Sequence, residues 1–441
     1  MKTLALSIFI TLFSFVQLFG QHPLLQSGPM PGYAEMREVA LWLQTKKSAD
    51  VFIKYHVKDQ TDTPRFSSHV QTSKENAFTA VLIADTLVPG KRYSYRLFID
   101  GMEAIFAFPL EFQTPPLWRW RTEPPEFTML TGSCAYINQP EHDRSGTPYG
   151  GDYRIFENMA RHQADFMVWL GDNIYLREPD WNSKTGIDAR YTHTRSIPEM
   201  QAFLASTHHY AIWDDHDFGP NDSDKGFFNK DKTLDAFKYF WANPGYGTSG
   251  MEGAITSFQW GDADFFLLDN RWYRDPDLLQ GETKTILGQK QLQWLLNNLV
   301  TSNATFKVVA MGGQFLSTAG MYESYTANGF ANERQAIIDF IYQHQIKNVI
   351  FLTGDVHFTE LSKLKEDGKP AIWDFTFSTM SAGPNTRGNE WKNQLRVQGT
   401  VVTKRNFGKI GFRGKTGARE LVVECYDTDN QLQWQKIIQQ E

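Results

Sequence analysis

The chain has 441 residues, which is more than a single hydrophobic core usually contains, so its length predicts two domains. A hydrophobic fraction of 41%, with 14% aromatic residues, is enough for packed cores and excludes a disordered chain. The formal net charge of −6 and the absence of any run of like charges argue against the basic surface that nucleic-acid binding requires.

The first twenty residues have the pattern of a secretory signal peptide. Lys2 provides a charged start, an apolar stretch runs from Leu4 to about Phe19, and we expect cleavage near Gly20 or Gln21. The alternative is a transmembrane anchor, but the apolar stretch is shorter than the ~20 residues that a membrane span needs. The sequence therefore predicts a secreted or periplasmic protein with no transmembrane segment in the mature chain.

Residues 21–118 have the pattern of a small β-domain. The expected strands cover residues 38–43, 50–55, 78–83, 93–99 and 104–108. Several of them alternate between apolar and polar residues, and turn residues separate them. This spacing predicts an immunoglobulin-like or fibronectin-like sandwich, and nothing in it is a candidate for catalysis.

A proline-rich stretch at 114–125 marks the expected boundary, and residues 125–441 form the second domain. Apolar strands alternate there with helical patterns, which indicates an α/β fold with parallel pairing. Strands are expected at 127–131, 166–170, 210–213, 264–269, 306–311 and 348–353. Helices are expected at 153–162, 198–207, 231–241, 288–300 and 332–345. Residues 420–425 and 432–438 are expected to form a closing hairpin.

Four of these apolar strands lead directly into side chains that can bind metal ions. The segments after the strands are Gly132-Ser133-Cys134, Gly171-Asp172-Asn173-Ile174-Tyr175, Asp214-Asp215-His216-Asp217 and Gly354-Asp355-Val356-His357. In parallel sheets, ligands gather beyond the carboxyl ends of the strands. We therefore expect these side chains to meet at one place.

The residue types at these positions suggest two different metal ions. A thiolate from Cys134 and a phenolate from Tyr175 suit ferric iron, since each must lose a proton to bind. Asp172 is three residues from Tyr175, so one turn can direct both at the same ion, and a carboxylate can also bridge two ions. The oxygen-rich remainder suits Ca²⁺, Mg²⁺ or Mn²⁺ more than zinc. It consists of Asp172, Asp215, Asn221, Asp222 and Asp355.

Two further residues are candidates for catalysis. If two bound ions promote the displacement of an alcohol from a phosphoryl group, His216 has three possible roles. It could bind a metal ion, protonate the leaving alkoxide, or donate a hydrogen bond to the phosphoryl group. We favour a role in catalysis without metal binding, because the neighbouring Asp215 already offers an anionic ligand. Arg271 is either a bidentate partner of a phosphate or part of a structural ion pair. His208 and His209 are interpreted as packing or surface residues.

The two cysteines, Cys134 and Cys425, leave two interpretations open. A structural disulfide between them would suit an exported chain. A metal thiolate at Cys134, with Cys425 as a small buried residue, is the other possibility. The place of Cys134 at a strand end, like the other candidate ligands, favours the metal.

Together these motifs resemble those of the PhoD-like alkaline phosphatases, which are calcineurin-like metallophosphoesterases related to purple acid phosphatases. The resemblance covers roughly residues 127–441 and includes Asp269-Asn270-Arg271, and the N-terminal β-domain also fits the family. It implies an α/β fold, a four-layer αββα sandwich preceded by a small all-β domain. It also implies a centre of two or three ions with Fe³⁺ and Ca²⁺, and hydrolysis of phosphomonoesters or diesters.

Residue by residue, the resemblance implies that Cys134, Tyr175 and His357 bind iron and that Asp172 bridges the ions. It implies that Asp215 and Asp355 bind the second metal and that His216 approaches the substrate phosphate. Asn221 remains a candidate metal ligand from the oxygen-rich group. One departure is Gly312-Gly313-Gln314, where related phosphoesterases have a histidine. The second ion then either lacks a nitrogen ligand or takes an oxygen from Gln314.

The sequence thus predicts an exported, metal-dependent phosphatase that hydrolyses small phosphomonoesters by in-line attack of a metal-bound hydroxide. The expected cofactors are Fe³⁺ and Ca²⁺, with Mn²⁺, Mg²⁺ or Zn²⁺ as alternatives. The closest alternative activity is that of a phosphodiesterase or a phospholipase D-like enzyme at the same site. An alternative of another class is a cell-surface binding protein with a degenerate site. The sequence predicts no oligomeric state.

Overall fold

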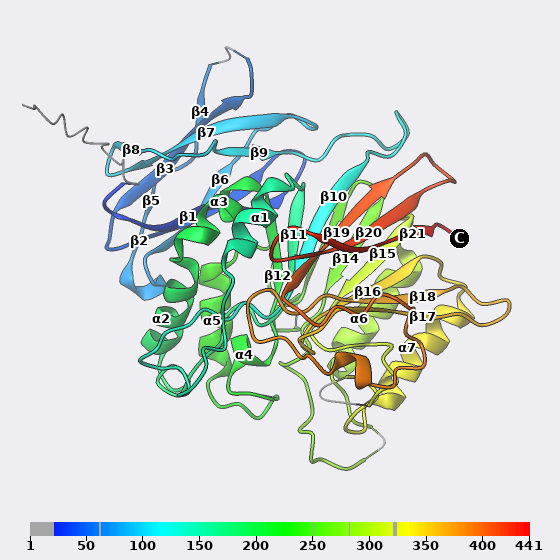
Figure 1. The fold of residues 1–441 in the computed structure, drawn as a ribbon. Coiled ribbons are helices and arrows are strands. Elements are labelled where there is room, and N and C mark those ends of the chain that lie inside the picture. The colour runs from blue at the N-terminus through cyan, green and yellow to red at the C-terminus, as the bar shows by residue number, and fades with distance from the viewer. Residues whose placement is uncertain (1–21, 61–62, 249, 282, 321–323) are drawn as a thin grey trace, which may run out of the picture.

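The computed structural model describes residues 22–60, 63–248, 250–281, 283–320 and 324–441 (Figure 1). The predicted signal peptide at 1–20 lies outside these residues. Within the described ranges, no helix is both long enough and apolar enough to cross a membrane.

The N-terminal region is all-β, as predicted, and consists of two antiparallel sheets. The first sheet has the order β1-β2-β6, with strands at Leu25–Ala34, Val39–Thr45 and Thr79–Ala84. The second sheet has the order β4-β3-β7-β8, with strands at Arg65–Phe66, Asp50–Val57, Arg92–Ile99 and Met102–Ala104. β5 at Val70–Gln71 pairs with β3, β9 at Glu111–Gln113 pairs with β7, and a short 3₁₀ helix covers Lys74–Asn76. Leu41, Ile53 and Leu97 belong to the buried core of this region.

Two six-stranded sheets form the centre of the second region. One has the order β12-β11-β10-β19-β20-β21. Its strands are His208–Ile212, Phe166–Leu170, Phe127–Gly132, Asn406–Arg413, Glu420–Asp427 and Leu432–Gln439. The pairs among β10, β11 and β12 are parallel, and the pairs from β10 through β21 are antiparallel. The predicted closing hairpin is β20 and β21.

The other sheet has the order β13-β14-β15-β16-β18-β17. Its strands are Thr256–Trp260, Ala263–Leu267, Phe306–Ala310, Val349–Thr353, Ile372–Thr376 and Glu360–Leu364. The four central strands are parallel, and the two outer strands are antiparallel to their neighbours. Strands such as β15 and β16 are buried along their whole length, as expected of parallel strands that are covered on both faces.

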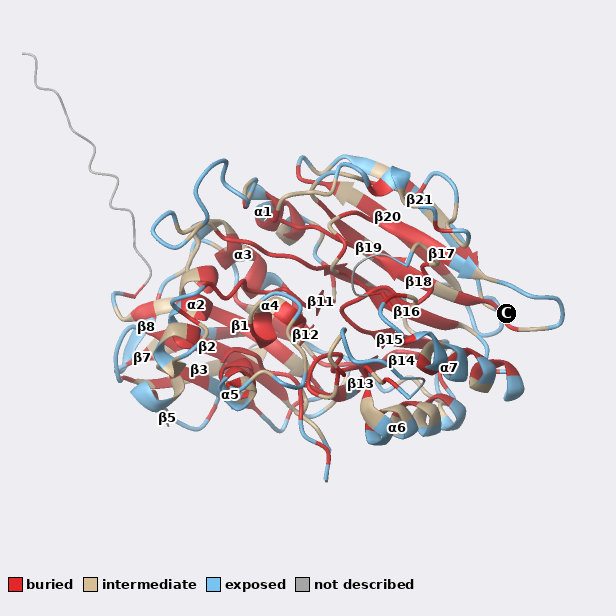
Figure 2. Cartoon of the chain, turned by 90° about the horizontal axis from the view of Figure 1, so that it is seen from below, coloured by how far each residue is buried: buried red, intermediate tan, exposed pale blue. Residues whose placement is uncertain are grey.

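Helices cover the outer faces of both sheets. On the first sheet lie α1 (Arg154–Arg161), α2 (Lys184–Arg195), α3 (Pro198–Ser206) and α5 (Lys230–Phe240). On the second lie α6 (Gly288–Thr301) and α7 (Ala331–Gln343). The short helices α4 (Asp215–Phe218) and η2 (Gly388–Glu390) lie in loops. Figure 2 shows the buried residues of the sheets in red between helices whose outer faces are exposed, so the predicted αββα layering is confirmed.

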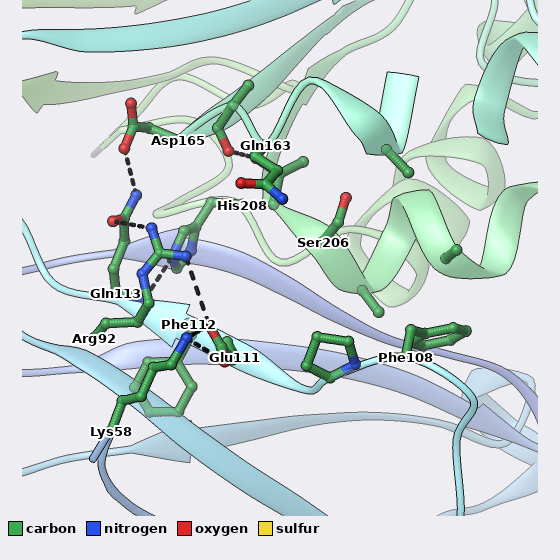
Figure 3. A pocket seen from close by; sticks show the side chains of 16 residues that line it. Lys58, Arg92, Phe108, Glu111, Phe112, Gln113, Gln163, Asp165, Ser206 and His208 are labelled. Carbon is green, nitrogen blue, oxygen red and sulfur yellow. Dashed lines mark hydrogen bonds and ion pairs between the residues drawn. The ribbon is translucent and has the colours of Figure 1, made fainter. Parts of the chain in front are cut away.

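His208 joins the N-terminal sheets to the start of the first large sheet. Its Nδ1–H donates to the carbonyl of Gly32 at 2.8 Å, and its Nε2 accepts from the N–H of Gln113 at 3.1 Å. The side chain of Gln113 in turn donates to Asp165, just before β11, at 2.7 Å. These groups border a cavity of about 350 Å³ between the two regions (Figure 3). The interpretation of His208 as a packing residue is confirmed, since it is 2% exposed.

His209 is also a packing residue, in the layer between β12 and the helices. Its Nδ1 accepts from the indole N–H of Trp169 at 2.9 Å, and its ring lies edge-on to Phe203. Burial lowers the pKa of His209 to about 3 and that of His208 to about 4. Both imidazoles are therefore neutral in the folded protein at physiological pH.

One N-terminal prediction is wrong, and one strand was missed. The strand expected at 104–108 is instead the short β8, which ends at Ala104, and the chain then turns so that Phe106 and Phe108 pack against each other. β1 was not predicted, because its sequence contains two glycines and two prolines. It forms because it pairs with β2 and packs against α3 and β12.

Candidate metal centre

The loops after the parallel strands meet at one edge of the two large sheets, as predicted. Three overlapping groups of side chains have their ligand atoms within 4.8 Å of one another. The groups are Cys134, Asp172 and His357; Asp172, Asp215 and His216; and Asp214, Asp215 and Asp355. Asp172 belongs to the first two groups and Asp215 to the last two, so the groups form one continuous cluster. A carboxylate between two ions, as predicted for Asp172, is compatible with this arrangement.

One side of the cluster contains sulfur and nitrogen donors. It is formed by Cys134, Asp172, Tyr175 and His357. Sγ of Cys134 lies 3.6 Å from Oδ2 of Asp172, and the hydroxyl of Tyr175 lies 3.3 Å from Nε2 of His357. Nδ1–H of His357 donates to the carbonyl of Gly383 at 2.6 Å. This hydrogen bond leaves Nε2 as the nitrogen with a free lone pair, which is the form of histidine that binds metals.

Four residues of this cluster have a left-handed backbone. The φ angles are 62° at Cys134, 52° at Asp172, 69° at Asp355 and 59° at His357. Residues with a Cβ rarely adopt this conformation, and such strain concentrates at functional sites where the surroundings impose it. The tight turns that follow the strands therefore direct these side chains inward at a cost to backbone stability.

Burial makes it costly for this side of the cluster to carry its charges without a cation. Burial raises the pKa of the Cys134 thiol to about 12 and raises that of Tyr175 well above its usual value. Burial also raises the pKa of Asp172, and the negative charge of Asp215 adds to the effect. A bound cation would reverse these shifts by favouring the thiolate, phenolate and carboxylate. The donor set therefore fits a strongly charged metal ion.

Asp215 behaves differently. Burial alone would raise its pKa, but the positive charges of His216 and Arg271 and the N–H of Asp222 outweigh burial and hold the pKa below its usual range. The N–H of Asp222 donates to Oδ2 of Asp215 at 2.8 Å. Oδ1 of Asp215 receives no hydrogen bond from the described residues. Asp215 thus carries a negative charge with one oxygen available to a cation.

Arg271 forms the structural ion pair that the sequence left open as an alternative. Its Nε donates to Oδ1 of Asp214, its side chain is 0% exposed, and its Nη2 lies 3.8 Å from Oδ1 of Asp215. Asn270 donates to the same oxygen of Asp214 at 2.7 Å. Because this guanidinium is enclosed, it affects the candidate metal site through its contacts with Asp214 and Asp215.

Asp214 also explains the glycine at position 312. A Cβ at Gly312 would lie 2.2 Å from Oδ2 of Asp214, which is far inside contact distance. The carboxylate of Asp214 thus occupies the space into which a side chain at 312 would project. A histidine at this position is excluded as long as Asp214 and Arg271 keep their places.

Gln314 is held in a separate polar network. Its amide nitrogen donates to Glu360 at 2.9 Å and to Thr376 at 3.1 Å, on β17 and β18. These hydrogen bonds do not support the prediction that Gln314 supplies an oxygen to an ion. The other alternative, a second site without a nitrogen ligand from this segment, fits the structure better.

His216 and Asn221 lie where two cavities meet. One cavity, of about 400 Å³, lies over Asp172, Asp215, Asp355 and His357, and the other has a volume of about 350 Å³. The side chain of His216 is 21% exposed, with Nε2 at 3.8 Å from Oδ2 of Asp215. His216 can therefore meet both the candidate ligands and a bound substrate.

Sequence reasoning missed Tyr149, which borders both cavities. Its hydroxyl lies 3.1 Å from Nδ1 of His357, although 208 positions separate the two residues. Tyr149 lies in the loop between β10 and α1, where no strand end or motif marks it. Only its proximity to Pro148 and Gly150, which indicates a turn, distinguishes it in the sequence.

The disulfide interpretation is wrong, because both cysteines are free and buried. Cys425 lies in the middle of β20, where its thiol contacts Oδ1 of Asn406 at 3.5 Å. Cys134 lies instead at the metal-ligand cluster, 3.2 Å from the hydroxyl of Ser378.

Two facing sheets between helices, with a buried cluster of sulfur, nitrogen and oxygen donors beyond the strand ends, define a metallophosphoesterase fold. The family model described as PhoD-like phosphatase matches residues 129–421, and the chain belongs to this family. A model described as a domain of unknown function (DUF7800) matches residues 22–116.

Individual relatives agree with this assignment. Alkaline phosphatase D of Bacillus subtilis (strain 168) is 29% identical over an alignment of 356 residues, and the match covers 67% of this chain and 59% of that protein. The chain therefore spans less than two thirds of the length of that relative. A solved structure of PhoD has a TM-score of 0.74 at 19% identity and covers 93% of this chain and 91% of its own.

A purple acid phosphatase from yellow lupin (Lupinus luteus) seeds has a TM-score of 0.65 at 11% identity. The match covers 93% of this chain and 74% of the lupin protein. At such low identity, the likeness to both solved structures shows a shared fold.

Proposed function

We propose that this protein is a metal-dependent hydrolase of phosphoric esters that acts on small phosphomonoesters. The observation that carries the proposal is the convergence of Cys134, Asp172, Asp215, Asp355 and His357 from separate strands into one buried cluster. Membership of the PhoD-like phosphatase family and the name of the Bacillus subtilis relative support the choice of reaction.

We propose Fe³⁺ and Ca²⁺ as the ions, with Mn²⁺, Mg²⁺ or Zn²⁺ as alternatives at the second site. Cys134, Tyr175 and His357 would hold iron, Asp172 would lie between the ions, and Asp215, Asp355 and Asn221 would hold the second ion. When bound, such ions polarise phosphoryl oxygens and lower the pKa of water. The high pKa values of the thiol and the phenol support a strongly charged ion on their side.

His216 is the residue that we propose to move a proton. Its ring packs against that of Tyr175, with centroids 4.2 Å apart, and its own backbone N–H donates to Asp172 at 3.3 Å. These contacts hold the imidazole at the cavity wall with Nε2 near Asp215. From there it can protonate the oxygen of the departing alcohol. Arg271 serves as a positioning residue that keeps Asp215 ionised.

Elemental analysis together with one pair of variants tests the proposal. The purified protein should contain iron and calcium at near-stoichiometric levels and should hydrolyse 4-nitrophenyl phosphate. Asp172→Asn should lose metal and activity together, because the shared ligand is gone. Asp165→Asn is the matched control at the opposite end of β11, where the carboxylate contacts Gln113 and Thr128, and it should keep both. Activity that survives in Asp172→Asn would refute the assignment of the site.

Phosphodiester hydrolysis is the second candidate, and the two cavities favour it. One cavity extends from the cluster towards Pro384 and Asn385, and the other extends towards Trp181, so there is space for organic groups on two sides. Comparing kcat/KM for 4-nitrophenyl phosphate and bis(4-nitrophenyl) phosphate separates the two activities. A strong preference for the diester would overturn the phosphomonoesterase proposal. The intact ligand set argues against a binding protein with a degenerate site.

We further propose that the protein is exported, on the basis of the charged start and apolar stretch of residues 1–20. Mass spectrometry of protein collected from outside the cytoplasm should give a chain that begins near Gln21. Recovery of the uncleaved chain from the cytoplasm alone would contradict export.

A further inference from the structure

A second cavity opens beside the candidate metal centre. It has a volume of about 350 Å³ and lies between the loop that contains residues 142–149 and the loop that contains residues 175–181. It shares Tyr149, His216 and Asn221 with the cavity over the metal ligands. Small-molecule sites have volumes of about 300–1,000 Å³. The cavity is therefore large enough to receive the part of a substrate that extends away from the reacting phosphorus.

A buried ion pair joins the two loops that form this cavity. The guanidinium of Arg177 lies 2.8 Å from the carboxylate of Asp143, and their side chains are 6% and 11% exposed. Arg177 also donates to the carbonyl of Ile137 at 2.8 Å and stacks 4.1 Å over the ring of Tyr136. Because these contacts hold both loops in place, the cavity is preformed. A ligand therefore binds without the entropy cost of ordering the loops.

The same contacts neutralise the charge of Asp143. Its Oδ1 accepts from Arg177 and from the hydroxyl of Tyr136, and its Oδ2 accepts from the N–H of Gln139. With its charge balanced by Arg177, this carboxylate offers little attraction for a cationic ligand. The other charged side chains that line the cavity, Arg144 and Glu178, are exposed to solvent, so the surrounding rings are the feature suited to an uncharged organic group.

Aromatic rings form much of the cavity wall. Tyr149, on the first loop, is 46% exposed and meets the ring of Tyr136 edge to face at 5.0 Å. Trp181, on the second loop, is half-buried and donates its indole N–H to the carbonyl of Leu176 at 3.2 Å. The polar atoms of both rings have partners, so the rings offer apolar surface to a ligand. Planar aromatic groups are bound well by such surfaces, since ring pairs with centroids 4.5–7 Å apart attract one another.

We propose that this cavity binds the alcohol portion of the substrate and that the preferred substrates are phosphate esters of alcohols with an aromatic ring. The inference rests on the proposed function, which places the phosphoryl group at the ligand cluster. His216 lies on the shared wall, so an ester oxygen beside it directs its carbon chain into the aromatic cavity. Trp181 and Tyr149 then contact the ring of the alcohol.

The test compares 2-phenylethyl phosphate with 2-cyclohexylethyl phosphate. Both alcohols are poor leaving groups of similar basicity, and both have six-membered carbon rings. The two esters therefore differ mainly in whether the ring is planar and aromatic. The cyclohexyl ring is the more apolar, and simple hydrophobic burial would favour it. We expect kcat/KM to be about twofold to tenfold higher for the phenyl ester.

Trp181→Leu should abolish most of this preference, whereas Trp120→Leu should retain it. Trp120 is 92% exposed and borders neither cavity, so it controls for the loss of a tryptophan. Equal kcat/KM for the two esters in the native protein, or an unchanged preference in Trp181→Leu, would overturn the proposal.

A binding measurement separates this inference from the proposed function. Calorimetry with 2-phenylethylphosphonate and 2-cyclohexylethylphosphonate reports on the cavity without any turnover. If neither ester is hydrolysed but the phenyl phosphonate binds more tightly, and Trp181→Leu removes the difference, the cavity assignment stands and the hydrolase proposal fails. Equal binding of both phosphonates overturns the cavity assignment, whatever the activity.

Discussion

Replacing Gly312 with alanine tests whether the ion pair of Asp214 and Arg271 shapes the site. The added Cβ would lie 2.2 Å from Oδ2 and 2.3 Å from Cγ of Asp214, so the carboxylate must move by about an ångström to reach an ordinary contact. Overpacking of this kind costs about 1–3 kcal/mol. If the movement breaks the pair with Arg271, an uncompensated buried charge raises the cost to about 3–5 kcal/mol. We therefore expect Gly312→Ala to destabilise the protein by about 1–5 kcal/mol.

Denaturant titration of the metal-free protein measures this loss. Gly245→Ala is the matched control, because a Cβ there would meet only the hydroxyl of Thr256 at an ordinary 3.7 Å. The control should be neutral or stabilising by about 0.4–1 kcal/mol, since alanine restricts the unfolded chain. If both variants have the same free energy of unfolding, Asp214 does not fill the space beside position 312, and our account of the missing histidine is wrong.

Three further predictions concern individual side chains. Cys134→Ser should lower the iron content and remove any thiolate-to-iron absorption band, whereas Cys425→Ser should change neither; equal spectra in both variants would exclude a thiolate ligand. His216→Gln should reduce kcat by about 10²–10⁴-fold for alkyl phosphates and much less for 4-nitrophenyl phosphate, whose leaving group needs no proton; equal reductions would contradict the acid role. Burial lowers the pKa of His208 to about 4. The unfolded chain therefore binds more protons between pH 6.5 and 4, and His208 should cost about 3 kcal/mol of stability as the pH falls through this range. His208→Gln should flatten the pH dependence of the unfolding free energy in this window, and an unchanged slope would show that His208 is not the group that titrates.

The metal-ligand cluster could be predicted because its signal is local in the chain. Most of the candidate ligands follow a short apolar strand within a few residues, as Asp172 follows β11 and Asp355 follows β16. In parallel sheets such strand ends lie at one edge, so local patterns were enough to bring distant residues together. For Arg271 and Cys134 the sequence left two alternatives open each, because the choice depends on partners that are distant in the chain. The structure shows that Arg271 pairs with Asp214, 57 positions away, and that Cys134 forms no disulfide with Cys425.

Two of the elements that were missed, α2 and β1, depend on contacts outside their own residues. α2 lacks an apolar stripe because it buries two arginines, whose guanidinium groups have partners outside the helix. Arg190 pairs with Asp180 at 2.8 Å, and the guanidinium of Arg195 stacks 4.0 Å over Trp241. β1 is a strand despite its glycines and prolines because β2 supplies its hydrogen bonds. Local propensity gave the wrong answer in both places because tertiary contacts outweigh it.

The two sides of the candidate metal centre differ in where their charge balance comes from. Asp215 receives positive charge from the protein itself, through Arg271 and His216, and is ionised before any ion binds. Cys134 and Tyr175 have no such support, and burial favours their protonated forms. An ion at the thiol and phenol side must therefore displace protons in order to bind, whereas an ion at Asp215 meets a carboxylate that is already charged. The thiol and phenol side therefore needs a cation that competes well with protons, whereas His216, Arg271 and the N–H of Asp222 hold the carboxylate on the other side ionised in advance.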